Sequence, residues 1–267
     1  MKNQCIDVEE LKRLQLEMLV EIDKYCHAND IQYSLAYGTL LGAVRHQGYI
    51  PWDDDIDIMM LRADYDKFIS GFCAPNMEAL SHQKSGSYFL PFAKVVRTDT
   101  VMEEEVSIKS DMGVYIDVFP IDTLPSRKVS RSFLLACKRI LNSIYQFKVV
   151  RLSSHRSRLK NIILGAGKLL FKPITMHCLL VGMDRLSRAH AGKSSPYCGP
   201  IADVDKTSSR VFAKDLFASY TSLQFEDKRF KAISSYDTWL SQMYGNYMEL
   251  PPIDKRVSHH LFKAYWK

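Results

Sequence analysis

The chain has 267 residues, of which 46% are hydrophobic and 25% are charged, and its formal net charge is +6. This composition can build a sizeable core, so it excludes a wholly disordered chain, and the length suits one α/β domain with insertions or two small domains. The six cysteines are scattered without a CxxC pair, which argues against a zinc site and a disulfide framework and favours a reducing cytoplasm.

The first predicted element is an amphipathic helix over residues 7–27. Its apolar positions recur at helical spacing along one face: Leu11, Leu14, Met18 and Ile22. The first residues lack the apolar region of a signal peptide, so we expect no secretory leader here.

A strand over residues 31–36 and a helix over residues 39–46 are predicted next, separated by Gly38-Thr39. The free amides of a helix N-terminus attract phosphate. We therefore expect Gly38 and Thr39 to bind a phosphate group.

Three aspartates then recur at every second position: Asp53, Asp55 and Asp57. A strand over residues 54–60 would send Ile56, Ile58 and Met60 into the core and would place Asp55 and Asp57 together on the other face. Two carboxylates so close repel each other unless a cation lies between them, and oxygen ligands suit Mg²⁺ or Mn²⁺. A metal site beside a phosphate site is the minimum equipment for phosphoryl transfer. The alternative is a solvated strand face at a sheet edge.

Further elements are predicted from the same periodicities: a helix near 65–72, strands near 93–97 and 114–119, and a helix near 236–244. In the strand over 114–119, Asp117 lies on the face opposite Val114, Ile116 and Val118. An unpaired carboxylate there would be costly. It is therefore either a further metal ligand or a buried aspartate capped by backbone amides.

Charge is distributed unevenly along the chain. Residues 123–183 contain no Asp or Glu but twelve cations, without which the remaining residues carry −6: Arg127, Lys128, Arg131, Lys138, Arg139, Lys148, Arg151, Arg156, Arg158, Lys160, Lys168 and Lys172. Apolar residues alternate with them at helical spacing. We therefore predict a catalytic core over 1–122, a basic helical insertion over 123–195, and a segment over 196–267 that completes the catalytic domain. No run reaches the roughly 18 to 20 apolar residues that span a bilayer, although a peripheral contact with an anionic membrane stays open.

The motif GTLLGAVRHQGYIPWDDDIDI, residues 38–58, resembles the signature of the LicD family of phosphorylcholine transferases, in the nucleotidyltransferase-fold superfamily. Three further segments resemble landmarks of this family: KVVRTDTVMEE (94–104), GVYIDVFPID (113–122) and YGNYMELPP (244–252). Tyr37 departs from the pattern, since many members have a second glycine there. The resemblance implies an α/β (α+β) fold, with a nucleotidyltransferase-like mixed sheet flanked by helices.

The resemblance also implies a function. This is metal-dependent transfer of phosphocholine, or a related group, from CDP-choline or another CDP-linked donor, with release of CMP. The acceptor would be a sugar hydroxyl of a lipid-linked cell-surface glycan such as a teichoic acid, lipopolysaccharide or capsule precursor. Such an enzyme would work in the cytoplasm, at the inner face of the plasma membrane. Asp55, Asp57 and Asp117 would bind Mg²⁺ or Mn²⁺, and Asp53 would orient or deprotonate the acceptor.

Other residues are candidates for binding the substrates. Arg45 and His46 would contact the donor phosphate, or else only complement the helix dipole. Lys94 and Arg97 would bind the diphosphate, or else be exposed strand charges, and Glu104 is a further candidate. Trp52 would bind the trimethylammonium group through its aromatic face, with Tyr49 and Trp239 as further walls, although such aromatics are more often core. His259 and His260 are weaker candidates for an anion.

Two rival functions stay open. The chain could transfer a nucleotide and release pyrophosphate, or it could be a nucleic-acid-binding module that uses the basic segment. Against the second, the segment lacks zinc-finger, RRM-like and KH-like signatures.

Overall fold

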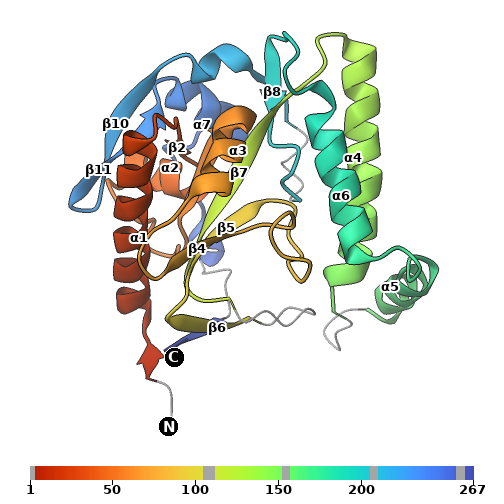
Figure 1. Cartoon of the computed structure of the whole chain (residues 1–267), viewed down its shortest axis with the longest axis horizontal. Helices are drawn as coiled ribbons and strands as arrows, with labels where there is room; N and C mark the ends of the chain where they lie inside the picture. The colour runs from red at the N-terminus through yellow and green to blue at the C-terminus, as the bar shows by residue number, and fades with distance from the viewer. Residues whose placement is uncertain (1–3, 105–111, 152–156, 205–209, 257–261) are drawn as a thin grey trace.

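The computed structural model describes residues 4–104, 112–151, 157–204, 210–256 and 262–267. Its centre is a mixed sheet in the order β2-β3-β7-β5-β4 (Figure 1). The strands are β2 (Ser34–Leu35), β3 (Asp57–Leu61), β7 (Tyr115–Thr123), β5 (Ala93–Arg97) and β4 (Met77–Leu80). β3 and β7 are parallel, while the other neighbours in this order are antiparallel. The expected mixed-sheet fold is confirmed.

Smaller sheets extend this core. β8 (Tyr197–Gly199) pairs with the end of β7 and with β9 (Phe212–Ala213). β10 (Tyr220–Phe225) and β11 (Lys228–Ile233) form a hairpin. A three-stranded sheet of β1 (Cys5–Ile6), β12 (Phe262–Trp266) and β6 (Thr100–Glu104) brings both ends of the chain together (Figure 1).

Helices pack on the central sheet where the periodicity predicts them. α1 (Val8–Ala28) begins after Asp7, whose carboxylate accepts a hydrogen bond from the amide of Glu10. Its expected apolar face is buried against the sheet. The others are α2 (Tyr37–Arg45), α3 (Arg62–Gly71) and α7 (Tyr236–Tyr244), with short 3₁₀ turns at Arg188–His190, Lys214–Phe217 and Ile253–Lys255.

A helical layer lies to one side of the sheet, as expected for the basic segment (Figure 1). It consists of α4 (Lys128–Val149), α5 (Arg158–Leu170) and α6 (Met176–Ser187), with α4 packed against both others. Two buried clusters lie in and beside this layer: one around Leu179 and Leu180 of α6, and one in which Leu134 and Leu135 of α4 pack with Leu124 and Ile201. Within the described ranges, no helix is long and apolar enough to cross a membrane.

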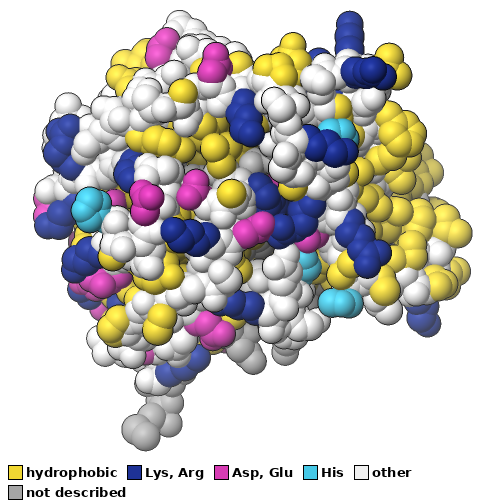
Figure 2. All heavy atoms as spheres, turned by 45° about the horizontal axis from the view of Figure 1, so that its top comes forward, with side chains coloured by type: hydrophobic (Ala, Val, Ile, Leu, Met, Phe, Trp, Pro, Cys, Tyr) yellow, Lys and Arg dark blue, Asp and Glu magenta, His cyan; other side chains and the backbone are white. Residues whose placement is uncertain are grey.

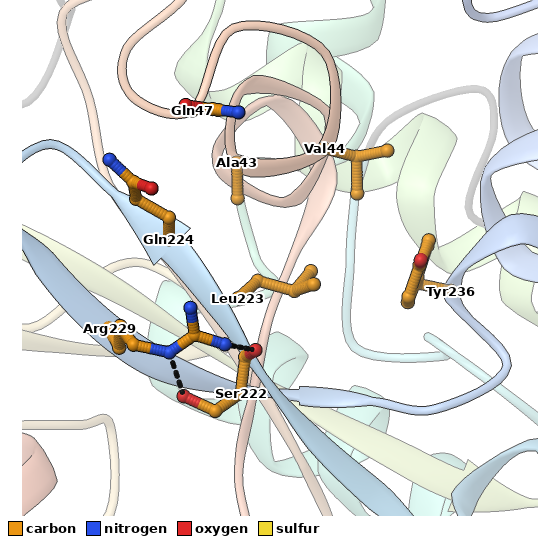
Figure 3. Close-up of a pocket in the computed structure, with 8 residues that line it drawn as sticks. All are labelled: Ala43, Val44, Gln47, Ser222, Leu223, Gln224, Arg229 and Tyr236. Carbon is orange, nitrogen blue, oxygen red and sulfur yellow. Dashed lines mark hydrogen bonds between the residues drawn. The ribbon is translucent and has the colours of Figure 1, made fainter.

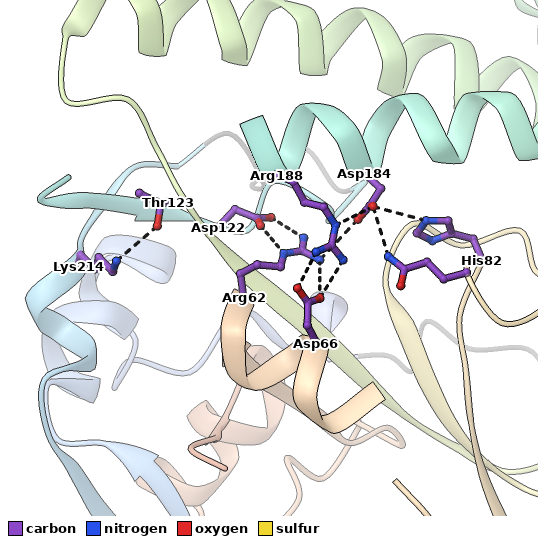
Figure 4. Close-up of polar contacts among 9 residues, drawn as sticks. Arg62, Asp66, His82, Asp122, Thr123, Asp184, Arg188 and Lys214 are labelled. Atoms are coloured by element: carbon purple, nitrogen blue, oxygen red, sulfur yellow. Dashed lines mark hydrogen bonds and ion pairs between the residues drawn. The ribbon is translucent and has the colours of Figure 1, made fainter. Parts of the chain in front are cut away.

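A network of ion pairs joins this layer to the sheet (Figure 4). Arg62, at the start of α3, donates two hydrogen bonds to Asp122 at the end of β7, at 2.6 and 3.0 Å. Arg188 donates to both oxygens of Asp66 on α3, and to Asp184 on α6. Burial raises the pKa of Asp122 to about 6, although the charge of Arg62 acts against this shift. These ion pairs thus bind α6 to the core through side chains that are buried or partly buried.

The aspartate strand differs from its expected form. β3 begins at Asp57 rather than at residue 54, because its pairing with β7 begins at Asp57, opposite Asp117. Ile56, Ile58 and Met60 are fully buried, as expected, but so is Met59 on the opposite face. β3 lies between β2 and β7, so the alternative of a solvated edge strand is wrong.

Candidate active site

The four candidate carboxylates gather where β3 and β7 run side by side. Asp57 is the direct cross-strand neighbour of Asp117. Asp57 is 8% exposed, and its pKa is raised well above the usual range, first by burial and then by the charges of Asp55, Asp117 and Asp53. Residues 60 positions apart in the chain therefore act on one another electrostatically. We call Asp53, Asp55, Asp57 and Asp117 the carboxylate cluster.

Lys94 supplies positive charge to this cluster. Its position on β5 lies opposite Asp117, and its Nζ is 2.6 Å from Asp117 Oδ1. The same ammonium lies 3.1 Å from the centroid of the Tyr115 ring, and the side chain is 5% exposed. The alternative that Lys94 is an ordinary exposed strand charge is wrong, because the sheet buries it beside a carboxylate. Its charge also lowers the pKa of Asp57.

The turn at Gly38-Thr39 lies against the cluster. The Thr39 hydroxyl accepts a hydrogen bond of 2.8 Å from the amide of Asp57, which ties the start of α2 to the start of β3. A Cβ at Gly38 would lie 2.5 Å from Asp53 Oδ2, so a larger residue would displace that carboxylate. Where we expected a phosphate group, the structure places the Asp53 carboxylate against Gly38.

Tyr37 occupies the position where the resemblance predicts glycine. Its φ is +41°, in the left-handed region that glycine enters without steric cost. Its ring packs on Phe119 at a centroid distance of 4.9 Å, and its hydroxyl donates to Asp203 at 3.0 Å. These contacts hold Tyr37 in this strained conformation. Helix α2 begins at Tyr37, two residues before its expected start.

Sequence reasoning missed Tyr244, the last residue of α7. Tyr244 is 42% exposed, yet desolvation of its phenol raises its pKa, and the charges of Asp57, Asp53 and Asp55 raise it further, while Arg210 acts in the opposite direction. The phenol therefore lies within electrostatic reach of the cluster. The segment over 244–252, which resembles a landmark of the LicD family, was the sequence signal that could have pointed to Tyr244. From the sequence, we assigned no role to any residue in that segment.

A pocket of about 410 Å³ opens beside the cluster and includes Tyr244 in its wall. It is lined by Leu41, Arg45, Ile50, Trp52, Tyr244, Asn246, Tyr247, Glu249, Leu250, Pro251 and Pro252. Arg45 donates to the carbonyls of Tyr247 and Glu249, at 2.7 and 3.3 Å. The pocket thus combines aromatic rings with a cation and a carboxylate. We call it the aromatic pocket.

Trp52 forms part of the aromatic pocket, and cations lie near its ring. The guanidinium carbon of Arg256 is 5.6 Å from the Trp52 ring, and the His46 ring lies edge-on to it at 6.2 Å. Burial and the charge of Arg45 lower the pKa of His46. Arg45, His46 and Trp52 are therefore brought together at this wall.

The other two aromatic candidates lie in the core. Trp239 is fully buried and stacks on Phe212 at 3.8 Å, so the expectation that it could close a ligand pocket is wrong. Tyr49 packs on Phe225, and its hydroxyl donates to the carbonyl of Lys12.

A second pocket, of about 270 Å³, lies between α2 and β10 (Figure 3). Ala43 and Val44 of α2 face Leu223 there, and Arg229 donates to Ser222. No carboxylate and no candidate residue is among the side chains that line it. The aromatic pocket is therefore the better candidate for binding substrate.

Two predicted binding residues, Arg97 and Glu104, are not brought to the cluster. Arg97 follows Lys94 by three positions and so lies on the opposite face of β5, where it donates to both oxygens of Asp99 at 2.9 and 2.6 Å. This pairing raises the pKa of Arg97. Glu104 ends β6, in the separate three-stranded sheet. His259 and His260 lie outside the described residues.

The chemistry of the carboxylate cluster fits a hard divalent cation. Its donors are all oxygens, and their mutual repulsion is relieved by a bound positive charge. Among the residues that the structure describes, however, no three Asp, Glu, His or Cys side chains are arranged to hold a metal ion. Asp117 is paired with Lys94 instead. Metal binding would require these side chains to rearrange.

Comparisons with known proteins find similar sequences. Residues 30–134 match the family model described as LicD/FKTN/FKRP, nucleotidyltransferase domain. The chain is 28% identical over 265 residues to the lipopolysaccharide cholinephosphotransferase LicD of Haemophilus influenzae. This alignment covers 96% of this chain and 97% of that protein. A short segment also matches an uncharacterized protein of Rickettsia typhi, with 45% identity over 21% of this chain and 19% of that protein. Another match is to an uncharacterized protein of Rickettsia prowazekii, with 61% identity over 14% of each chain.

Proposed function

The chain carries a nucleotidyltransferase domain of the LicD family, and we propose that it is a phosphotransferase that moves phosphocholine from CDP-choline to a sugar hydroxyl of a cell-surface glycan. CMP would be the leaving group. One observation carries this proposal: the similarity to the Haemophilus influenzae cholinephosphotransferase extends over nearly all of both chains. The name of that relative makes a lipopolysaccharide precursor the first acceptor to test, before teichoic acid or capsule precursors.

Each carboxylate has a role in this proposal. Asp55, Asp57 and Asp117 would hold Mg²⁺ or Mn²⁺, which supplies positive charge to the diphosphate when it is bound. Asp53, held against Gly38, would orient the acceptor hydroxyl or take its proton. Positioning and electrostatics would provide most of the acceleration, since a loose phosphoryl transition state needs little covalent help.

The donor would lie in the aromatic pocket. Trp52 would contact the trimethylammonium group, which cannot donate a hydrogen bond and is bound through aromatic faces and nearby negative charge. Arg256 lies 5.6 Å from the Trp52 ring, so the trimethylammonium group would have to displace this guanidinium or use the other face of the ring. Arg45, in the same wall, is the candidate for contact with the donor phosphates, and Arg210 is a second cation near the cluster.

The domain boundaries also belong to this proposal. Residues 1–122 and 196–267 would form the catalytic domain, and residues 123–195 would be an insertion. The buried cluster around Leu179 and Leu180, formed by residues of α4 and α6, supports this division, although the cluster around Leu134 and Leu135 also includes Ile201 of the C-terminal segment.

Product analysis tests the reaction. CDP-choline labelled separately in cytidine and in choline is incubated with the acceptor and Mg²⁺, and the choline label should move while the cytidine label stays with CMP. A parallel incubation with CTP labelled in cytidine tests the alternative, which the description of the matched domain keeps open. Movement of that cytidine label to the acceptor with release of pyrophosphate would instead favour a nucleotidyltransferase. A parallel thermal-shift screen with CDP-ethanolamine, CDP-glycerol and CDP-ribitol would identify the head group.

A further inference from the structure

Helix α5 presents its apolar stripe to solvent rather than to the core. Leu159, Ile162, Ile163, Leu169 and Leu170 recur at helical spacing and are between 54% and 74% exposed. An amphipathic helix of a globular protein normally buries such a stripe. Its opposite side is the one that packs, since a Cβ at Gly167 would collide with the ring of Phe147 on α4.

Helix α4 continues this apolar surface. Val129, Phe133 and Ile140 are 82%, 72% and 62% exposed, and they lie on the side of α4 away from its buried residues Leu134 and Leu135. Figure 2 shows hydrophobic side chains gathered over the helical side of the molecule, with Lys and Arg side chains beside them. We call the exposed apolar side chains of α4 and α5 the helical patch. A contiguous patch of this kind marks an interaction surface.

Positive charge accompanies the helical patch. Arg158 and Lys160 lie on either side of the stripe on α5, at about 100° per residue around the helix, and both are exposed. The segment from 123 to 183 contains no acidic residue that could oppose a negatively charged partner. Among the described cations of this segment, Lys138 is buried, and it donates a hydrogen bond to the carbonyl of Pro200.

We propose that the helical patch lies in the interface of a membrane with anionic lipids, with the apolar stripe of α5 among the acyl chains and its flanking cations at the head groups. An apolar stripe flanked by Lys and Arg is the pattern of helices that lie in the plane of a bilayer surface. A second copy of the chain is a poorer partner, because two basic surfaces without carboxylates repel each other. This membrane contact does not depend on the transfer reaction of the preceding section.

The contact would also position the catalytic site. The ion pairs of Arg62 and Arg188 bind the helical layer to α3 and β7, the strand that carries Asp117 (Figure 4). A membrane-bound helical layer would therefore hold the domain that carries the carboxylate cluster at the lipid surface, where the lipid-linked acceptor of the proposed function would lie.

Flotation of the full-length protein with vesicles tests this proposal. One vesicle is phosphatidylcholine alone, and the other is an equimolar mixture of phosphatidylcholine and phosphatidylglycerol. The protein should float with the mixed vesicle at low salt, and less at high salt. The triple variant Leu159→Gln, Ile162→Gln, Leu169→Gln should reduce this binding about tenfold or more without lowering the melting temperature, because all three side chains are exposed.

The variant Val8→Gln is the matched control. Val8 is an exposed apolar residue of α1, at 55%, away from the helical patch, and its loss should leave flotation unchanged. Equal or absent binding to the two vesicles at low salt overturns the proposal, as does unchanged binding of the triple variant. The proposal is also overturned if the protein dimerises in the absence of vesicles and the triple variant does not. The helical patch would then bind a second copy of the chain. Transfer to a soluble acceptor, assayed in parallel, reports on the proposed reaction separately from membrane binding.

Discussion

At the parallel pair β3–β7, carboxylates crowd into a partly buried space beside one buried ammonium, whereas the α4–α5 surface holds cations and apolar side chains without a single acid. The first region concentrates like charge out of water, and the second leaves large apolar groups in water. Each arrangement is unfavourable in the free protein. Each becomes favourable with a partner that supplies what it lacks, a cation in one case and a lipid surface in the other.

This comparison teaches where to look for function. Local rules of folding are usually broken where a ligand later compensates for them. The two regions are joined by ion pairs that link α3 to β7 and to the end of α6. Changes in the carboxylate cluster, at Lys94, at this junction and in the aromatic pocket therefore separate their contributions.

The largest effect is expected from Asp57→Asn. The swap is nearly isosteric, and it removes a carboxylate whose pKa is raised by burial and by three neighbouring aspartates, so the melting temperature in chelator should rise. Phosphocholine transfer should fall about a hundredfold or more, because the charge that holds the cation on the diphosphate is lost. Asp54→Asn, which changes the adjacent buried carboxylate, is the control and should keep its activity. Transfer by Asp57→Asn at the wild-type rate would show that the site is misassigned.

Lys94→Met should destabilise the metal-free protein. It leaves the Asp117 carboxylate without the ammonium 2.6 Å away, and loss of one partner of a buried ion pair costs about 3 kcal/mol or more. Denaturant unfolding in chelator measures this cost. Mg²⁺ should raise the melting temperature more in this variant than in the wild type, because the cation then takes over the neutralisation of Asp117.

The control for Lys94 is Lys12→Met. Its ammonium also lies over a tyrosine ring, 4.7 Å from the centroid of Tyr49, but outside the cluster. An equal response of Lys94→Met and the wild type to Mg²⁺ would count against metal binding at Asp117.

At the junction, Asp122 should give a pH dependence of stability. Its pKa is raised from 3.8 to about 6 by burial, so the native state holds a proton that the unfolded state has lost between these values. The protonated Asp122 therefore contributes its full stabilisation below pH 3.8, and this contribution is lost as pH rises through about 6. It amounts to about 3 kcal/mol at most. The difference in unfolding free energy between wild type and Asp122→Asn should therefore fall with rising pH over this range. A constant difference would refute the assignment.

The smallest effect concerns the aromatic pocket. Trp52→Leu should weaken CDP-choline binding by roughly 1 to 2 kcal/mol, the scale of a desolvated cation–π contact, and should change CMP binding little. Isothermal titration with CDP-choline, CMP and CDP-glycerol separates these outcomes. Equal loss for CDP-choline and CDP-glycerol would favour a polyol donor over choline.

Much of the local structure follows from the sequence. The strand Ala93–Arg97 and the helix Tyr236–Tyr244 have the predicted bounds, and α1 buries its predicted face. The Asp-x-Asp pattern and the resemblance pointed to the carboxylates that the structure brings together. These predictions succeed because hydrophobic periodicity and turn residues act over a few neighbouring positions.

Contacts between distant residues were decided only by the tertiary structure. The register of β5 against β7 places Lys94 opposite Asp117, whereas strand alternation alone puts Arg97, three positions further on, on the other face. Tyr244 reaches the cluster only because α7 packs on α2. Such neighbours depend on strand pairing and helix packing, which no local pattern specifies.

The apolar stripe of α5 shows the same division. The sequence by itself determined that Leu159, Ile162 and Leu169 share one face, and that no acid lies near them in the chain. Only the tertiary structure decided that this face points to solvent, because α5 packs on α4 through Gly167 instead. Periodicity states which side chains lie together on a helix, while packing decides whether they meet the core or a partner outside it.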